Sequence, residues 1–313
     1  MSAPLSISLV MPTYDEPERL AAALESLSRQ DYSRAATQII VVDDASRRQL
    51  EADRLHAALA PFELLLIRNR QNLGRSRARN AALREATGDI VVFLDSDMTV
   101  EPDFLSIHAK YHQAHAEAAF VGNIRFASEI PATWLTRYIE RRGVHGAEAN
   151  QPMHFKCFVT GNSSVRRSSL LRVGFFDEDL TAYGGEDLEL GYRLHRAGIP
   201  LYYAPQALSH QHHLRALEPL CQLMQTYGQR SIPVLLRKHP ALAAVLRLGF
   251  LSASSLSPRR WALQLALSPI VYFPLRWLTR LMLRRYVPGI LFSYLFWSSR
   301  TRGYLQARKR EAC

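Results

Sequence analysis

The chain has 313 residues, 48% of them hydrophobic and 21% charged, which is ordinary for a globular protein and argues against disorder. Because this length exceeds the usual size of one domain, we expect one large α/β unit with a smaller unit appended, or two packed units. The net charge is +11, but residues 1–213 carry 23 Lys and Arg against 26 Asp and Glu, whereas residues 214–313 carry 16 against 2. The basic character therefore belongs to the last hundred residues, and it indicates an anionic membrane surface or a nucleic acid as partner.

The three cysteines, Cys157, Cys221 and Cys313, are odd in number and have no CxxC spacing. This pattern predicts neither a disulfide framework nor a zinc knuckle, and it favours a reducing compartment. The N-terminal residues lack a basic stretch followed by a long apolar run, so we expect no secretory signal peptide.

The first 115 residues alternate between two hydrophobic periodicities. Apolar, β-rich runs occupy 7–11, 38–44, 62–68 and 89–95, and amphipathic helix patterns occupy 16–30, 46–60 and 74–86. Such alternation predicts βαβ units and a mostly parallel sheet that is covered on both faces. Ligands of such sheets bind outside the carboxyl ends of the strands, so the residues that follow each run are candidates for a site.

The pattern becomes mixed between residues 118 and 213. Strands are expected within 118–126 and 155–165, a helix within 186–198, and a last strand with a histidine-bearing loop within 202–213. After residue 213 the composition shifts towards Leu, Arg and aromatic residues, and we place a domain boundary there.

Two carboxylates, Asp95 and Asp97, flank Ser96 directly after the apolar run 90–94. Carboxylates at this spacing can aim at one point if the chain turns, and their hard oxygens suit Mg²⁺ or Mn²⁺ held together with substrate phosphates. The alternative is that Asp97 simply begins a turn in a solvated loop.

No GxGxxG follows the first strand and no GxxxxGK[ST] is present, which disfavours a dinucleotide site and a P-loop. Instead Tyr14 follows the first strand and offers a ring on which a base can stack, and Asp44 follows the second and can accept a hydrogen bond from a base N–H. The alternative is helix capping, by Thr13 or Asp15 for the first helix. Asp44 or Ser46 would then cap the second.

These blocks together resemble the family 2 glycosyltransferases with the GT-A fold. The matching blocks, spread over residues 6–213, are MPTYDEPERL, IIVVDDAS, RNRQNLGRSRARNAALREATGDIVVFLDSD, TGNSSVRRSSLLRVGFFDEDLTAYGGEDLELGYRLHRAG and SHQHH. They are most similar to members with a GGED-type block, among them bacterial polysaccharide and chondroitin-type enzymes. The resemblance implies a Rossmann-like, mostly parallel sheet, with a nucleotide-binding half at 1–115 and an acceptor-binding half at 116–213. A basic, aromatic-rich helical region at 214–313 would follow.

Carried over by position, the resemblance implies that one set of residues holds a nucleotide-sugar. These are Pro12, Thr13, Tyr14, Glu16, Asp44, Arg79, Asp95 and Ser96. Asp95 would lie near the ribose and the metal, and Asp97 would bind the Mn²⁺ or Mg²⁺ that bridges the diphosphate. Arg79 would lie near the diphosphate, unless it and the neighbouring arginines occupy the solvent face of a helix.

A second acidic pair, Glu186 and Asp187, follows Gly184 and Gly185 at the start of a predicted helix. Acidic residues stabilise a helix start, which is the alternative explanation. An inverting transfer needs a base that takes the proton of the acceptor hydroxyl. The resemblance implies that Asp187 is this base, that Glu186 orients sugar hydroxyls, and that the glycines let the backbone approach the sugar closely.

Three histidines stand in the SHQHH block, without a zinc motif such as HExxH. The resemblance makes His210 a third ligand for the metal or the diphosphate, and His212 is the competing candidate.

The segment 261–297 combines Trp, Phe and Leu with Arg276, Arg280, Arg284 and Arg285. Its longest uncharged run has 15 residues, which is shorter than the about 20 that a spanning helix needs. Arginines at four-residue spacing beside apolar positions predict an interfacial, monotopic helix on an anionic membrane surface. The alternative is a helical subdomain with a basic surface. No nucleic-acid module accompanies the charge, so a nucleic-acid partner is not expected.

The resulting prediction is a metal-dependent, inverting hexosyltransferase of polysaccharide biosynthesis, peripheral on the cytoplasmic face of the inner or plasma membrane. It would transfer a sugar from a UDP-sugar to a hydroxyl of a lipid-linked or cell-surface glycan. The absence of a QxxRW block favours single additions over processive synthesis. The alternatives are a nucleotidyltransferase of similar fold, or a glycan- or membrane-binding scaffold without catalytic activity.

Overall fold

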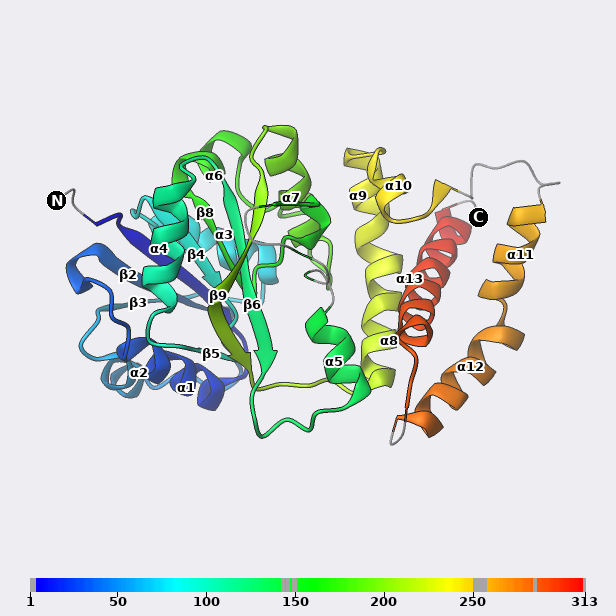
Figure 1. Ribbon diagram of the computed structural model, residues 1–313, viewed down its shortest axis with the longest axis horizontal. Helices are drawn as coiled ribbons and strands as arrows, with labels where there is room; N and C mark the ends of the chain where they lie inside the picture. The colour runs from blue at the N-terminus through cyan, green and yellow to red at the C-terminus, as the bar shows by residue number, and fades with distance from the viewer. Residues whose placement is uncertain are drawn as a thin grey trace. The chain divides into compact units, whose positions relative to one another are not determined.

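The computed structural model describes residues 4–141, 144, 147, 151–249, 258–283 and 286–311. The chain forms two compact units. The first comprises residues 1–130, 143–178 and 186–213, and the second comprises 131–142, 179–185 and 214–313. Figure 1 shows the strands in the first unit and the long C-terminal helices in the second.

A single mixed sheet organises the first unit. Its strands are β1 (Ile7–Thr13), β2 (Thr37–Asp43), β3 (Leu64–Arg68), β4 (Ile90–Leu94), β5 (Met98–Val100), β6 (Ala119–Phe126), β7 (Pro152–Met153), β8 (Asn162–Arg166) and β9 (Leu201–Gln211). The strand order is β3-β2-β1-β4-β8-β6-β9-β5, with β7 beside β9. The stretch from β3 to β4 is parallel throughout, as predicted, whereas β8 runs antiparallel to both of its neighbours.

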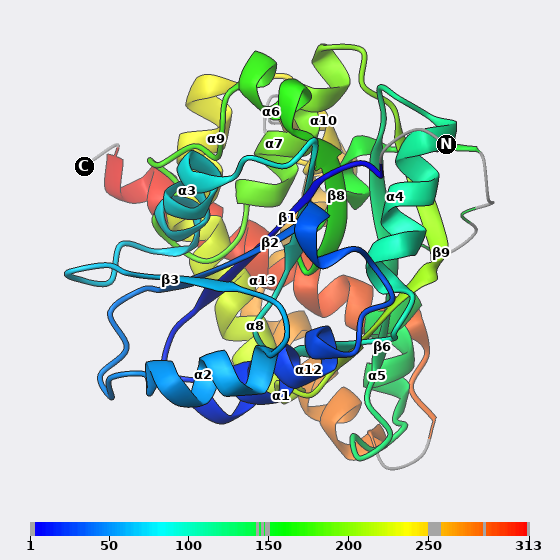
Figure 2. The ribbon, with the colours of Figure 1, turned by 90° about the vertical axis from the view of Figure 1, so that its left-hand side faces the viewer.

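Helices cover both faces of this sheet. They are α1 (Pro17–Ser28), α2 (Ala52–Leu59), α3 (Arg75–Glu85), α4 (Phe104–Ala114), α6 (Arg167–Val173) and α7 (Glu186–Arg196). One core joins α1, α2 and α4 to the sheet, and a second core joins α3, α6 and α7 to it. Within β4, Val92 faces the first core and Phe93 the second, which is why the strand is apolar at every position. Figure 2 shows α1 and α2 on the side of the sheet opposite to α3 and α7.

The strand expected within 155–165 begins later than the sequence pattern indicates. Residues Phe155–Cys157 form a 3₁₀ turn instead, and β8 starts at Asn162. Asn162 pairs with Leu94, the last residue of β4, so the preceding residues have no ladder partner on that strand. The ring of Phe155 stacks on His195 of α7, with ring centroids 5.1 Å apart.

The second unit is helical, which confirms the predicted C-terminal helical region. It contains α5 (Trp134–Arg141), α8 (Leu217–Thr226), a π-helical turn (Tyr227–Ser231), α9 (Ile232–Lys238), α10 (Leu242–Val245), α11 (Pro258–Leu267), α12 (Pro269–Met282) and α13 (Gly289–Glu311). Gly228 and Gly303 lie where the π-helical turn and α8 cross α13. A Cβ atom on Gly228 would lie 1.9 Å from the carbonyl oxygen of Arg300, so only glycine permits this approach. In the part of the chain that the structure describes, no helix is long and apolar enough to cross a membrane.

Candidate active site

The parallel strands β1, β2 and β4 end at one edge of the sheet, and the predicted donor-binding residues follow them there. The N–H of Asp44 donates to the carbonyl oxygen of Thr13 at 2.9 Å, which joins the ends of β1 and β2. Asp95 follows β4, the other neighbour of β1. The alternation of strands and helices thus brings Thr13, Asp44 and Asp95 to the same edge.

The chain after β1 turns sharply and exposes one aromatic ring. Tyr14 is 43% exposed, and Asp15 adopts a left-handed φ of 56°. The Asp15 N–H donates to Ser46 Oγ at 2.9 Å, and the Asp15 carboxylate pairs with Arg47 at 2.6 Å. The N-caps of α1 and α2 are Glu16 and Glu51, neither with a side-chain cap bond, so the capping alternative is wrong for both helices. The exposed Tyr14 ring is available for stacking.

Asp44 is buried and holds the loop that connects β3 to α3. Its carboxylate accepts hydrogen bonds from Asn69 Nδ2 at 2.7 Å and from the backbone N–H groups of Leu73 and Gly74 at 3.0 and 2.8 Å. A carboxylate has about four lone-pair positions, so one remains for a ligand. Asp44 therefore shapes this edge of the site whether or not it also contacts a base.

Glu16 accepts a hydrogen bond from Arg19 one turn later on α1, at 2.8 Å. The other terminal nitrogen of Arg19 lies 3.1 Å from Nδ1 of His213, in the histidine-bearing loop after β9. Glu16 thus belongs to a polar chain that links the end of β1 to this loop.

Arg79 of α3 is the cation at the centre of the site. Its side chain is 2% exposed, and Nη2 donates to Asp95 Oδ1 at 3.0 Å. Nη1 lies 3.5 Å from Glu186 Oε1, and the guanidinium lies over the Phe176 ring, 5.6 Å from its centroid. One buried guanidinium therefore connects the acidic pair after β4 with the acidic pair at the start of α7.

The alternative that these arginines lie on a solvent face is wrong for Arg79. It holds better for its neighbours on α3, because the side chains of Arg75 and Arg77 are 46% and 40% exposed. Asn80, which follows Arg79, is also buried. Its side-chain amide donates to the Phe176 carbonyl and accepts from the Phe176 N–H, each at 2.9 Å, and so fixes the backbone there.

Asp187 lies in the first turn of α7, partly buried beside Glu186. Burial, and next to it the Glu186 carboxylate, raise the pKa of the Asp187 carboxyl, whereas Arg79 and a hydrogen bond from Thr160 lower it, and the net result is a pKa of about 6. Thr160 Oγ1 donates to Asp187 Oδ1 at 2.8 Å, and the Thr160 N–H donates to Oδ2 at 3.3 Å. A carboxyl with this pKa is suited to exchange a proton near neutral pH.

Thr160 is a site residue that the sequence reasoning missed, although it stands in the TGNSSV block. The next residue, Gly161, accepts a hydrogen bond from the Asp95 N–H at 3.4 Å. A Cβ atom on Gly161 would lie 2.9 Å from Met98 Cε and 3.4 Å from Asp95 Oδ2, so the glycine keeps this approach open. Thr160 and Gly161 carry no charge that would mark them as site residues in the sequence. Their role becomes visible only through their contacts with Asp95 and Asp187.

Gly184 and Gly185 belong to the second unit and have left-handed φ angles of 81° and 104°. A Cβ atom on Gly184 would lie 3.2 Å from the Tyr227 ring, and one on Gly185 would lie 3.1 Å from Leu235. Backbone conformation and packing thus require glycine here before any sugar is considered.

The histidine loop lies beside the DxD motif through the pairing of β5 with β9. Thr99 is the cross-strand partner of His210, and the His212 N–H donates to the Asp97 carbonyl at 2.9 Å. His212 therefore lies opposite Asp97. His210 lies two pairs further along, with Nε2 2.8 Å from the Glu101 carboxylate.

The ring of His212 lies between two polar groups. Nδ1 faces the carboxylate of Glu129, which can only accept, so Nδ1 carries a proton. Nε2 lies 2.8 Å from Thr99 Oγ1. A carboxylate behind one imidazole nitrogen is the usual arrangement of a metal-binding histidine, and a cation on Nε2 would replace the contact with Thr99.

Within the described residues, no group of three His, Cys, Asp or Glu side chains forms a metal site on its own. Asp97, largely buried, and His212 are nevertheless a suitable donor pair for a cation that completes its coordination with substrate oxygens. Mg²⁺ is usually held in this way, by one or two carboxylates together with phosphates. The residues present fit such a cation.

We expect that Arg79→Met destabilises the protein by about 3 kcal/mol, because it leaves the largely buried Glu186 and the nearby Asp95 without their shared counter-charge. Chemical denaturation at neutral pH measures the free energy of unfolding. Arg77→Met on the same helix is the matched control, because its half-exposed ion pair contributes less than about 1 kcal/mol. Equal losses in both variants would contradict a central role for Arg79.

Comparison with known proteins identifies the family. Residues 8–174 match the glycosyl transferase family 2 model, and residues 141–216 match the model described as the N-terminal domain of galactosyltransferase. The glycosyltransferase YfnE of Bacillus subtilis is 27% identical in an alignment of length 258 that covers 67% of this chain and 65% of that protein. An N-acetylglucosaminyltransferase of Sinorhizobium fredii is 31% identical in an alignment of length 221 that covers 66% of this chain and 52% of that protein. This chain thus spans about half to two thirds of the length of these relatives.

A mannosyltransferase from Pyrobaculum calidifontis, solved in complex with GDP-Man and Mn²⁺, shares the fold. Its structure superposes with a TM-score of 0.60 at 19% sequence identity, covering 96% of this chain and 88% of that one. The family model matches more than half of the sequence. The chain therefore belongs to glycosyl transferase family 2 and has its GT-A fold.

Proposed function

We propose that this protein is a metal-dependent, inverting glycosyltransferase that moves a sugar from a UDP-sugar to an acceptor hydroxyl. The observation that carries the proposal is the Arg79 guanidinium, which contacts Asp95 on the donor side and Glu186 next to the proposed base. Because one buried cation connects the two acidic pairs, both can act on a single reacting centre. The nucleotide-sugar in the related mannosyltransferase complex supports the choice of donor class.

Asp187 acts as the general base. It takes the proton of the acceptor hydroxyl while that oxygen forms a bond to the anomeric carbon, and the bond from this carbon to the diphosphate oxygen breaks. A single displacement inverts the configuration and releases the nucleoside diphosphate. Glu186 and Arg79 set the electrostatic potential at Asp187, and Thr160 fixes the orientation of its carboxylate.

Asp97 and His212 would hold the divalent cation, Mn²⁺ or Mg²⁺, and Asp95 would lie near the ribose. When bound, this cation stabilises negative charge on the leaving diphosphate. Of the two candidate histidines, His212 is better placed than His210, because it lies opposite Asp97 and has the Glu129 carboxylate behind Nδ1, whereas Nε2 of His210 faces Glu101. Tyr14 stacks on the base at the far end of the donor.

The acceptor is a lipid-linked or cell-surface glycan, and the enzyme acts as a peripheral protein on the cytoplasmic face of a membrane. The charge of the helical region supports this location, because no Asp or Glu occurs between Glu218 and Glu311. A nucleotidyltransferase would need a glycine-rich phosphate-binding loop after β1. The sequence has no such loop there, which argues against this alternative. We retain 1–213 as the catalytic domain, with its two halves divided near residue 115, and 214–313 as the membrane-associating region.

Asp187→Asn should abolish sugar transfer while donor binding remains, because the amide oxygen can still accept from the Thr160 hydroxyl but the amide cannot take a proton. Release of UDP in the presence of a lipid extract as acceptor measures transfer, and calorimetric titration with UDP-sugars measures binding. Asp53→Asn, an exposed carboxylate on α2, is the control and should behave as the parent protein. Transfer at the parent rate in Asp187→Asn would exclude Asp187 as the base.

Asp97→Ala should weaken donor binding in the presence of Mn²⁺ and remove the dependence of that binding on the metal. Titrations with and without Mn²⁺, followed by addition of a chelator, measure both effects. His212→Gln should show a smaller change in the same direction, and His210→Gln should show none. A metal dependence that survives in Asp97→Ala would contradict the assignment of the motif.

Thr160→Val should move the acid limb of the pH–rate profile to higher pH by about one pH unit, because a hydrogen bond to a charged group contributes about 1.5–3 kcal/mol. Asp187 is active only when ionised, so the rate falls as the pH drops through its pKa of about 6. The Thr160 hydroxyl stabilises the ionised form, and its loss raises that pKa. Thr160→Ser keeps the hydroxyl and should keep the parent profile. An unchanged acid limb in Thr160→Val would show that this hydrogen bond does not tune the base.

A further inference from the structure

The outer side of α11 and α12 is an exposed apolar surface. Thirteen large hydrophobic side chains are exposed among the described residues, and nine of them lie between residues 261 and 290. We call the seven on α11 and α12 the apolar face: Trp261, Leu265, Ile270, Phe273, Trp277, Leu278 and Leu281. Ile270, Trp261 and Trp277 are 81%, 65% and 63% exposed. A contiguous exposed apolar surface of this kind marks an interaction site.

The polarity of α12 is the reverse of that of an ordinary surface helix. Its buried positions carry hydroxyl groups, with Tyr272 hydrogen bonded to Ser299 of α13 at 2.8 Å and Thr279 bonded to the Leu275 carbonyl at 2.7 Å. Its outward positions are mainly apolar, with Arg280 as the exposed cation among them. A helix that faces only water shows the opposite pattern, with its apolar stripe packed inward.

The two described arginines of α12 differ, because Arg280 is 70% exposed whereas Arg276 packs against aromatic rings. Arg276 lies over the rings of Tyr272 and Phe273, at 5.6 and 5.1 Å from their centroids, and Arg302 of α13 lies over the same two rings. Arg280 is 3.8 Å from Glu218. Arg284 and Arg285 lie outside the described residues. Among the described residues of α12, the exposed side chains are therefore mainly apolar, with Arg280 as the exposed cation.

We infer that the apolar face inserts into the interfacial layer of an anionic lipid bilayer, so that α11 and α12 lie flat in it. This inference deepens the membrane location in the proposed function and rests on it for the choice of partner. Trp261 and Trp277 are amphipathic side chains of the kind that concentrate at the interface between membrane and water. The inserted groups are side chains of interfacial helices rather than a spanning segment.

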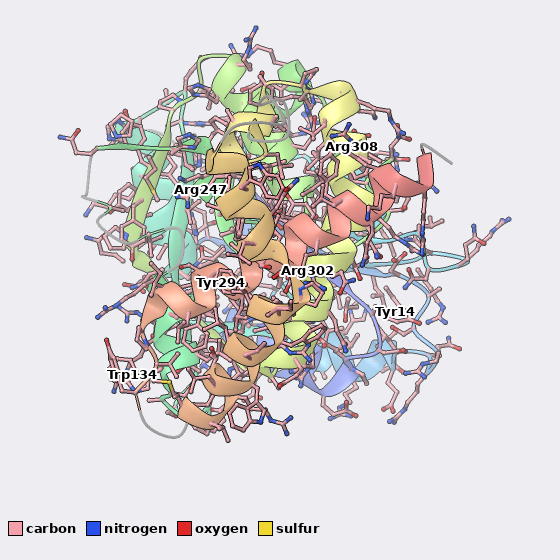
Figure 3. All side chains as sticks on the ribbon, turned by 90° about the vertical axis from the view of Figure 1, so that its right-hand side faces the viewer. Tyr14, Trp134, Arg247, Tyr294, Arg302 and Arg308 are labelled. Carbon is pink, nitrogen blue, oxygen red and sulfur yellow. The ribbon has the colours of Figure 1, made fainter. Side chains whose placement is uncertain are left out.

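Charge complementarity favours a bilayer over a protein partner. The helical unit has no acidic residue between Glu218 and Glu311, and exposed basic residues occur at the ends of α9, α10 and α13. Figure 3 shows α11 and α12 on the side turned towards the viewer, with Arg247 and Arg308 on either side of α11. An apolar face on a unit with exposed basic residues, among them Arg280 of α12 itself, matches the acyl region and the anionic headgroups of one leaflet.

The test is co-sedimentation of the full chain with phosphatidylcholine vesicles that contain phosphatidylglycerol. The variant Ile270→Gln/Trp277→Gln should lower the partition coefficient by about tenfold or more, because it removes two of the largest inserted side chains. The matched control is Leu65→Gln/Leu171→Gln, which replaces two exposed hydrophobic residues of the first unit and should bind as the parent. Binding of the parent should decrease only partly at high salt, because apolar insertion is not screened.

Further measurements separate this inference from its alternatives. Tryptophan emission should shift to shorter wavelength on addition of vesicles, and Trp277→Phe should reduce that shift. Donor titration in buffer should be equal in the double variant and the parent, which shows that the variant is folded and that its defect is separate from the donor site. Equal vesicle binding by variant and parent would overturn the inference. The inference would also be overturned if the parent chain self-associated through the apolar face in solution and did not bind vesicles.

Discussion

The buried guanidinium of Arg79 is the interaction on which the site depends. A charge in the protein interior is costly unless it is paired, and Arg79 is 2% exposed between Asp95 and Glu186. These partners come from the end of β4 and the start of α7, while Arg79 itself belongs to α3. Because Arg79 needs both carboxylates as partners, its ion pairs hold α3, the end of β4 and the start of α7 together. Both acidic pairs are positioned as a result.

Uncharged groups complete this arrangement. The loop before β8 places Thr160 against Asp187 and Gly161 against Asp95, so one dipeptide contacts both acidic pairs. The pairing of β8 with β4 sets the position of this dipeptide, because β8 begins at Asn162, which pairs with Leu94 at the end of β4. Burial and Glu186 raise the Asp187 pKa, Arg79 and Thr160 lower it, and the result is about 6. A carboxyl with this pKa can take up a proton near neutral pH.

The helical unit follows different physical rules. Glycines at the crossing of the π-helical turn with α13 bring backbones into direct contact, and polar hydroxyl groups occupy buried positions of α12. Apolar side chains then remain on the outer side of α11 and α12. In water this arrangement leaves hydrophobic area exposed, whereas at a bilayer surface the same area is buried.

The hydrophobic pattern alone located β1, β2, β4, α1, α3 and α7 to within a few residues, because buried strands and amphipathic helices have distinct periods. It also placed Thr13, Asp44 and Asp95 at strand ends, and the motif blocks indicated family 2, which the family model confirms. The burial of Arg79, the contacts of Thr160 and the pairing of His212 with Asp97 came only from the tertiary structure. Arg79 and Glu186 are more than a hundred residues apart, and Thr160 carries no charge to reveal it. The outward direction of the apolar side of α12 was likewise decided by packing against α13, since a helical pattern shows which residues share a face but not which way that face turns.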